Sequence, residues 1–142
     1  MTVKQLSVFV ENRKGRLGEV LAVLKQHHVN ILSMSLADTT EYGLLRLIVS
    51  DAEVGRESLI AAGFSSMVTE VLIIKIPHRA GSLQEILETV AKRDISVEYM
   101  YGLSVGVADA CVVMKTGDLP TAMQVLAENG IGTLTAAELA AL

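Results

Sequence analysis

The chain repeats one sequence pattern twice, and the two copies lie 66 residues apart. The aligned segments are residues 10–17 (VENRKGRL) with 76–83 (IPHRAGSL), 28–31 (HVNI) with 94–97 (DISV), and, after a slip of one residue, 62–64 (AGF) with 129–131 (NGI). The strongest match falls in a turn that follows an apolar run and precedes a helical pattern. Each half of the chain is therefore predicted to be one structural unit, and the two turns are the first candidates for function.

Composition limits the class of protein. Each half of the 142 residues is near the smallest size that buries a sufficient core, so the halves are expected to pack on each other or on a second copy. No apolar run reaches the roughly 18 residues that cross a bilayer, and the N-terminus shows no signal region. The single cysteine, Cys111, fits a reducing cytosol. A net charge of −4 and 4% aromatic residues disfavour nucleic-acid binding. We predict a cytoplasmic protein with no membrane or nucleic-acid partner.

Alternating apolar residues predict strands, and apolar residues at i, i+3, i+4 and i+7 predict helices. In the first half we expect strands at 4–10, 29–37, 44–49 and 66–71, with helices from residue 17 and at 51–62. In the second half we expect strands at 71–76, 95–103, 108–115 and 131–134, with helices from residues 83 and 118. The apolar stripes of the two matched helices are Leu17, Val20, Leu21 and Leu24, and Leu83, Ile86, Leu87 and Val90. Residues 135–142 form either a terminal helical turn or a frayed tail.

The order β-α-β-β-α-β thus occurs twice. It predicts an α+β fold made of two ferredoxin-like units in tandem, with domains at residues 1–70 and 71–142. The apolar run from Met67 to Ile76 passes from the last strand of one unit into the first strand of the next, with no linker between them. This continuity suggests that the two units have a fixed mutual orientation.

Few residues have the pattern of a catalytic or metal site. The histidines are His27, His28 and His78, and an adjacent pair points its side chains in different directions, while no carboxylate or cysteine cluster completes a tetrahedral set. Cys111 lies in a strand pattern and is predicted to be a buried structural thiol. We therefore predict no enzyme, no cofactor and no metal.

The turns before the two matched helices remain as candidate functional sites. Free N–H groups at a helix N-terminus attract an anion such as a carboxylate, and Arg13, Arg16 and Arg79 add positive charge nearby. An ordinary tight turn with solvated cations is the alternative interpretation of the same residues.

These residues resemble the ACT domain, a small-molecule-sensing module with the same order of elements. Its loop pattern is Asp or Asn, two residues, Gly, one residue and Leu, which residues 12–17 (NRKGRL) match, and its second strand often begins Asn-Ile, as at Asn30 and Ile31. The first half is similar to the amino-acid-binding type found in phosphoglycerate dehydrogenase. Residues 94–101 are similar to the second unit of free-standing tandem ACT proteins.

The resemblance implies that paired domains set their sheets side by side and bind an amino acid at the junction. There, the loop of one domain faces the start of the second strand of its neighbour. The implied ligand-binding residues are Asn12, Arg13, Gly15, Arg16, Leu17, Asn30 and Ile31 in the first unit and His78, Arg79, Gly81, Ser82, Leu83, Ser96 and Val97 in the second. The second unit matches the family pattern less well, because His78 replaces Asp or Asn and Ser96 replaces Asn.

We therefore predict a non-catalytic regulatory protein, a homodimer that senses a free amino acid by allosteric change. One alternative is a regulatory subunit of an amino-acid biosynthetic enzyme, as in the acetolactate synthase small subunits. Another is a ligand-free structural dimerisation module. Glu11 is the only acidic residue in either loop, which favours a neutral or histidine-like ligand over lysine or arginine. The sequence allows two kinds of pairing: the two units of one chain with each other, or identical units of two chains.

Overall fold

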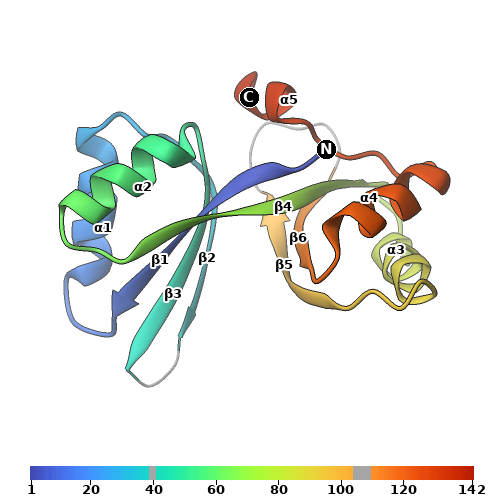
Figure 1. Ribbon diagram of the computed structural model, residues 1–142, viewed down its shortest axis with the longest axis horizontal. Coiled ribbons are helices and arrows are strands. Elements are labelled where there is room, and N and C mark those ends of the chain that lie inside the picture. The colour runs from blue at the N-terminus through green and yellow to red at the C-terminus, as the bar shows by residue number, and fades with distance from the viewer. Residues whose placement is uncertain (39–40, 104–109) are drawn as a thin grey trace. The chain divides into compact units, whose positions relative to one another are not determined.

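The chain forms two compact α+β units in a computed structural model that describes residues 1–38, 41–103 and 110–142 (Figure 1). The N-terminal unit comprises Lys4–Thr69, and the C-terminal unit comprises Glu70–Leu142 together with Met1–Val3. The elements are β1 (Val3–Glu11), α1 (Arg16–Gln26), β2 (Ile31–Asp38), β3 (Tyr42–Val49), α2 (Ala52–Ala61), β4 (Ser66–Ile76), α3 (Ser82–Ala91), β5 (Val97–Leu103), β6 (Ala110–Thr116), α4 (Leu119–Glu128) and α5 (Ala136–Ala140). The predicted α+β class and the two tandem units are confirmed, and the strands predicted at 66–71 and 71–76 form the single strand β4.

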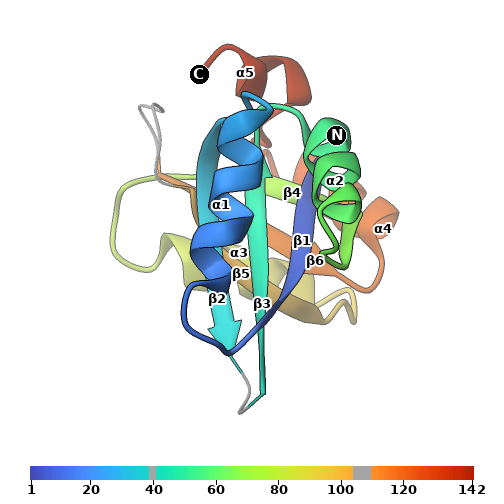
Figure 2. The same ribbon diagram turned by 90° about the vertical axis from the view of Figure 1, so that its left-hand side faces the viewer.

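In the N-terminal unit the strands lie in the order β2-β3-β1-β4, and α1 and α2 cover one face of them (Figure 2). Strand β3 runs antiparallel to both β1 and β2, which puts Leu47 opposite Leu6 on one side and Met34 on the other. Because residues that face each other across strands point to the same side, Leu6 and Leu47 lie under the helices. Leu24 of α1 and Leu59 of α2 close this core.

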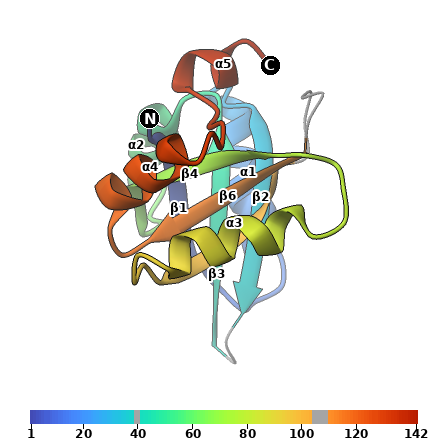
Figure 3. The ribbon, with the colours of Figure 1, turned by 90° about the vertical axis from the view of Figure 1, so that its right-hand side faces the viewer.

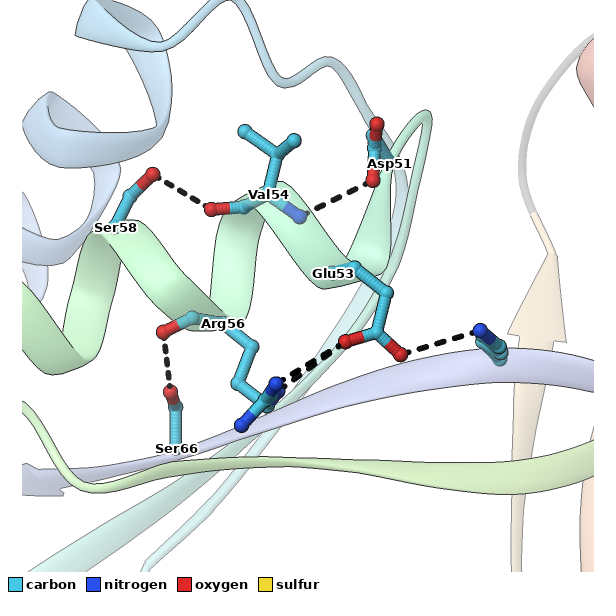
Figure 4. A network of polar contacts seen from close by, with 7 residues as sticks. Asp51, Glu53, Val54, Arg56, Ser58 and Ser66 are labelled. Atoms are coloured by element: carbon cyan, nitrogen blue, oxygen red, sulfur yellow. Dashed lines mark hydrogen bonds and ion pairs between the residues drawn. The ribbon is translucent and has the colours of Figure 1, made fainter.

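The local chemistry of α2 fixes where it begins and how closely it packs. The Asp51 side chain accepts a hydrogen bond from the Val54 N–H at 3.1 Å, which caps the helix, and Glu53 pairs with Lys4 of β1 (Figure 4). Gly55 lies against β1, since a Cβ built there would be 2.9 Å from Leu6 Cδ2. A glycine inside this helix thus lets α2 approach the sheet.

The C-terminal unit repeats this arrangement with the strand order β4-β6-β5, and α3 and α4 cover one face (Figure 3). Leu72 of β4 faces Met114 of β6, and both are fully buried. Ile86 and Val90 of α3 and Leu126 of α4 pack on them. Asp118 caps α4 by accepting a hydrogen bond from the Thr121 N–H, as the sequence predicted for a helix starting there.

The predicted last strand at 131–134 is wrong. Only a single bridge joins Thr133 to Ile74, made by hydrogen bonds from Lys75 N to Gly132 O and from Leu134 N to Ile73 O. Thr135 already caps α5 through a reciprocal pair of bonds with Glu138, so too few residues remain for a strand. The open question about the C-terminus resolves to a helical turn. Residues 39–40, between the strands predicted at 29–37 and 44–49, and residues 104–109, which include the start of the strand predicted at 108–115, lie outside the described residues.

Candidate functional site: two glycine turns and their cavities

Helices α1 and α3 begin differently from the other described helices. Each starts after a glycine in the left-handed region, Gly15 with φ 85° and Gly81 with φ 86°, and neither has a side-chain cap. In contrast, α2, α4 and α5 are capped by the side chains of Asp51, Asp118 and Thr135. The first N–H of each helix donates to the carbonyl of Arg13 or Arg79, at 3.2 and 3.3 Å. Because no side chain caps the N–H groups that follow, α1 and α3 retain donors and partial positive charge for an anion.

In the glycine turn before α1, both arginines form ion pairs with acidic neighbours. Arg13 Nε lies 3.2 Å from Glu11 Oε2, and Arg16 pairs with Glu11 at 3.8 Å and with Glu19. The Arg16 guanidinium also stacks over the Phe64 ring, 4.4 Å from its centroid. Arg16 is therefore packed into the unit, while Asn12 and Arg13 are exposed.

A small cavity of about 320 Å³ opens beside this turn. Of the residues predicted from sequence, it brings together Asn12, Arg13 and Leu17. It also includes four that the sequence prediction missed: Val10 and Glu11 of β1, Leu36 of β2 and Gly43 of β3. Leu36 faces the buried Leu45, so it lies on the helix-covered side of the sheet and yet is 50% exposed. Leu36 could have been identified from the sequence as an apolar residue on the core side of an edge strand.

In the glycine turn before α3, Arg79 donates two hydrogen bonds to Glu85, at 2.8 and 3.3 Å. This charge-assisted pairing lowers the pKa of the Glu85 carboxyl and raises the pKa of Arg79. The adjacent cavity is larger, about 920 Å³, and brings together all five predicted residues of the turn: His78, Arg79, Gly81, Ser82 and Leu83. Sequence reasoning missed the rest of the lining, which includes Leu87, Glu88 and Ala91 of α3 and Ala110 of β6.

The predicted residues at the starts of β2 and β5 do not join the turns of their own units. In the N-terminal unit the turn follows Glu11, which faces Tyr42, whereas Ile31 faces Val49 at the other end of β3. In the C-terminal unit Ile76 faces Ala110, whereas Val97 faces Thr116. Asn30 and Ser96, which precede these strands, are exposed. Within one unit, each turn and its second-strand start thus lie at opposite ends of the sheet.

Other kinds of site find no support in the part of the chain that the structure describes. There, no three His, Cys, Asp or Glu side chains gather as a metal site would need. None of its helices is long and apolar enough to cross a bilayer. Cys111 is buried in β6, as the strand pattern predicted.

Residues 1–142 match the model of the family described as the ACT domain pair. A crystal structure of a Bacteroides thetaiotaomicron protein is 33% identical, with a TM-score of 0.92, over 100% of this chain and 98% of that one. The ligand-free regulatory subunit of aspartate kinase from Thermus thermophilus shares the fold, with 12% identity and a TM-score of 0.61 over 88% and 91% of the two chains. The aspartokinase alpha and beta subunits are 14% identical, with a TM-score of 0.58 over 91% and 92%. No curated protein matches the sequence.

Proposed function

The chain belongs to the ACT-domain family as a domain pair, a regulatory type of module, and from this premise we propose that it binds a free amino acid at its two glycine turns. One observation carries the proposal. Of the described helices, the two that follow the turns are those that begin at a positive-φ glycine without a side-chain cap. A ligand carboxylate would accept hydrogen bonds from their first-turn N–H groups.

The second part of each site would come from another ACT unit. In the family the start of a second strand faces the turn of a neighbour, and here those starts carry Asn30 and Ile31, or Ser96 and Val97. The exposure of Asn30 and Ser96, and their position away from their own turns, support this pairing. The partner unit would belong to the same chain or to a second copy in a homodimer.

The proposed role is regulatory and non-catalytic, in the cytoplasm. An amino acid that binds one assembly state more tightly than another shifts the balance between them, and only that difference in affinity matters. The second candidate function is a regulatory subunit of an amino-acid biosynthetic enzyme. It is suggested by the shared fold of the Thermus thermophilus protein, which is itself a regulatory subunit.

A thermal-shift screen against the twenty amino acids tests the proposal. The ligand should raise the melting temperature with concentration, stabilising the protein by about 2.7 kcal/mol per site at a hundred times its dissociation constant. Gly15→Val and Gly81→Val place a β-branched side chain in each turn and should weaken the response. Gly63→Val is the matched control, because Gly63 also has a positive φ of 91° but lies outside both turns.

The result that would overturn amino-acid binding is no shift with any of the twenty compounds at millimolar concentration. A ligand-free dimerisation module would then be the better interpretation of the chain's function. Co-purification with a biosynthetic enzyme, together with an amino-acid response only in that complex, would favour the second candidate.

A further inference from the structure

The cavities beside the two glycine turns differ in how far they extend along the helix that follows. Beside α1 the cavity has a volume of about 320 Å³, and among the described residues its lining on that helix is Leu17 alone. Beside α3 the volume is about 920 Å³, and the lining continues from Leu83 to Leu87 and Ala91. Since a helix rises about 1.5 Å per residue, Leu87 lies about 7.5 Å along α3 from Ser82. The C-terminal turn therefore opens onto the longer space.

Strand register explains how the shorter cavity is closed. In the N-terminal unit, Leu36 of the edge strand β2 faces Leu45 of β3, on the helix-covered side of the sheet. Its side chain extends toward Gly43, because a Cβ built on Gly43 would lie 3.0 Å from Leu36 Cδ1. Leu36 and Gly43 both line the cavity. A leucine side chain thus occupies space at this wall.

The corresponding position in the C-terminal unit is Gly102. Gly102 of β5 faces Val112 of β6, which comes two residues after Ala110, a residue of the cavity lining. This register repeats that of the N-terminal unit, where the residue that faces Leu36 comes two residues after Gly43. A Cβ added to Gly102 would meet no atom of the described residues within 4 Å, its chain neighbours aside. Glycine therefore leaves open the space that leucine occupies in the other unit.

The wall that α3 contributes to the longer cavity is apolar. Leu83, Leu87 and Ala91 are spaced four residues apart, so they share one face of the helix, and the two leucines are half-buried. Gln84 and Glu88 lie next to them and are exposed, and the Gln84 amide donates a hydrogen bond to the Glu88 carboxylate at 3.2 Å. An apolar wall that begins at the turn suits the carbon side chain of a ligand whose carboxylate is held there.

We propose that the C-terminal turn selects amino acids with a large apolar side chain, which lies along Leu83 and Leu87 in the space left by Gly102. In the N-terminal unit Leu36 restricts the ligand to a small side chain. This inference rests on the proposed function, in which each turn binds an amino-acid carboxylate, and it assigns a different ligand class to each turn. Gly102 and Leu36 are the residues that determine this specificity.

Amide NMR of the full-length, ¹⁵N-labelled protein tests the proposal, with alanine, leucine, phenylalanine and lysine as probes. At residues 81–91, leucine or phenylalanine should bind roughly tenfold or more tightly than alanine, because additional methylene groups are buried. At residues 12–17, neither should bind more tightly than alanine. Alanine binding as tightly as both large apolar probes at residues 81–91 would overturn the proposal. Lysine binding there more tightly than leucine, through Glu88, would also overturn it.

Substitutions at the two aligned positions test the assigned residues. Gly102→Leu should weaken leucine binding at residues 81–91 roughly tenfold or more and leave alanine binding unchanged. Leu36→Ala should open the N-terminal cavity and strengthen leucine binding at residues 12–17. Gly117→Leu is the matched control, because it adds the same side chain at an exposed glycine of the same unit that does not line the cavity. It should leave leucine affinity unchanged.

Wild-type leucine affinity at residues 81–91 in Gly102→Leu would overturn the assignment. Gly102 is not among the described glycines with a positive φ, so its backbone can accept a side chain. Gly102→Val, which introduces a strand-favouring residue, decides the question if Gly102→Leu does not fold. The two proposals fail in different ways. No shift at either turn with any amino acid would contradict the proposed function and this inference together, whereas equal binding of alanine and leucine at both turns would contradict this inference alone.

Discussion

Arg79 and Glu85 form a doubly hydrogen-bonded ion pair, with Nη2 2.8 Å from Oε2 and Nη1 3.3 Å from Oε1. The residue aligned with Glu85 in the first repeat is Glu19, and it pairs with Arg16 instead of with the aligned Arg13. Arg13 pairs with Glu11, a residue that Pro77 replaces in the second repeat. The same acidic position is thus neutralised by different arginines in the two units.

This pair predicts a pH dependence for the C-terminal unit. Because Arg79 lowers the pKa of Glu85 in the folded protein, the pair stabilises the fold above the unfolded-state pKa of the carboxyl. That stabilisation is lost as the pH falls through the lower, folded-state pKa. A ¹³C NMR titration should find Glu85 titrating below the ordinary glutamate range, and Arg79→Gln should move it back up. An unchanged Glu85 titration in Arg79→Gln would contradict the assignment.

Two glycines three positions apart should respond in opposite ways to alanine. Gly18 lies inside α1, where an added Cβ would meet no atom within 4 Å, so Gly18→Ala should stabilise the protein by about 0.4–1 kcal/mol. Gly15 also has open space, but its φ of 85° strains any other residue, so Gly15→Ala should destabilise by about 1 kcal/mol. Urea denaturation measures both free energies of unfolding. The same sign for the two variants would contradict this account of the turn.

The apolar stripe of α1 should be energetically uneven. Leu24 is 1% exposed and belongs to the core of the N-terminal unit, so Leu24→Ala should cost roughly 2–5 kcal/mol. Leu21 is only half-buried, and its alanine variant should cost about 1 kcal/mol. Thermal and urea unfolding of the two variants provide the comparison, and equal losses would show that the burial of α1 is wrongly assigned.

The start of α4 should depend on one carboxylate. The Thr121 hydroxyl and N–H both donate to Asp118, which lowers the pKa of that carboxyl. Asp118→Ala should lower the unfolding free energy, whereas Asp118→Asn keeps an acceptor and should lower it less. Chemical denaturation at neutral pH measures both, and an Asn variant as unstable as the Ala variant would contradict the capping role.

Much of the fold was accessible from sequence because it depends on neighbouring residues. The spacing of Val20 and Leu24, the helix start at residue 118 and the glycine turns before the two matched helices are local signals, and each has its predicted structural counterpart. One exception is residues 131–134, where strand patterning competes with the Thr135 cap that begins α5 directly afterwards. There the short distance between two helices decided the outcome.

The sequence by itself determined the repeat, the order of its elements and the two glycine turns, because backbone conformation and helix caps are set within a few residues. Only the tertiary structure decided which space each turn borders. Leu36 joins the first turn through strand register, and Arg16 reaches Phe64 across 48 positions in the chain. Ala110 likewise joins the second turn through the pairing of β6 with β4. Cavities result from the volumes of side chains distant in sequence, so no local pattern records them.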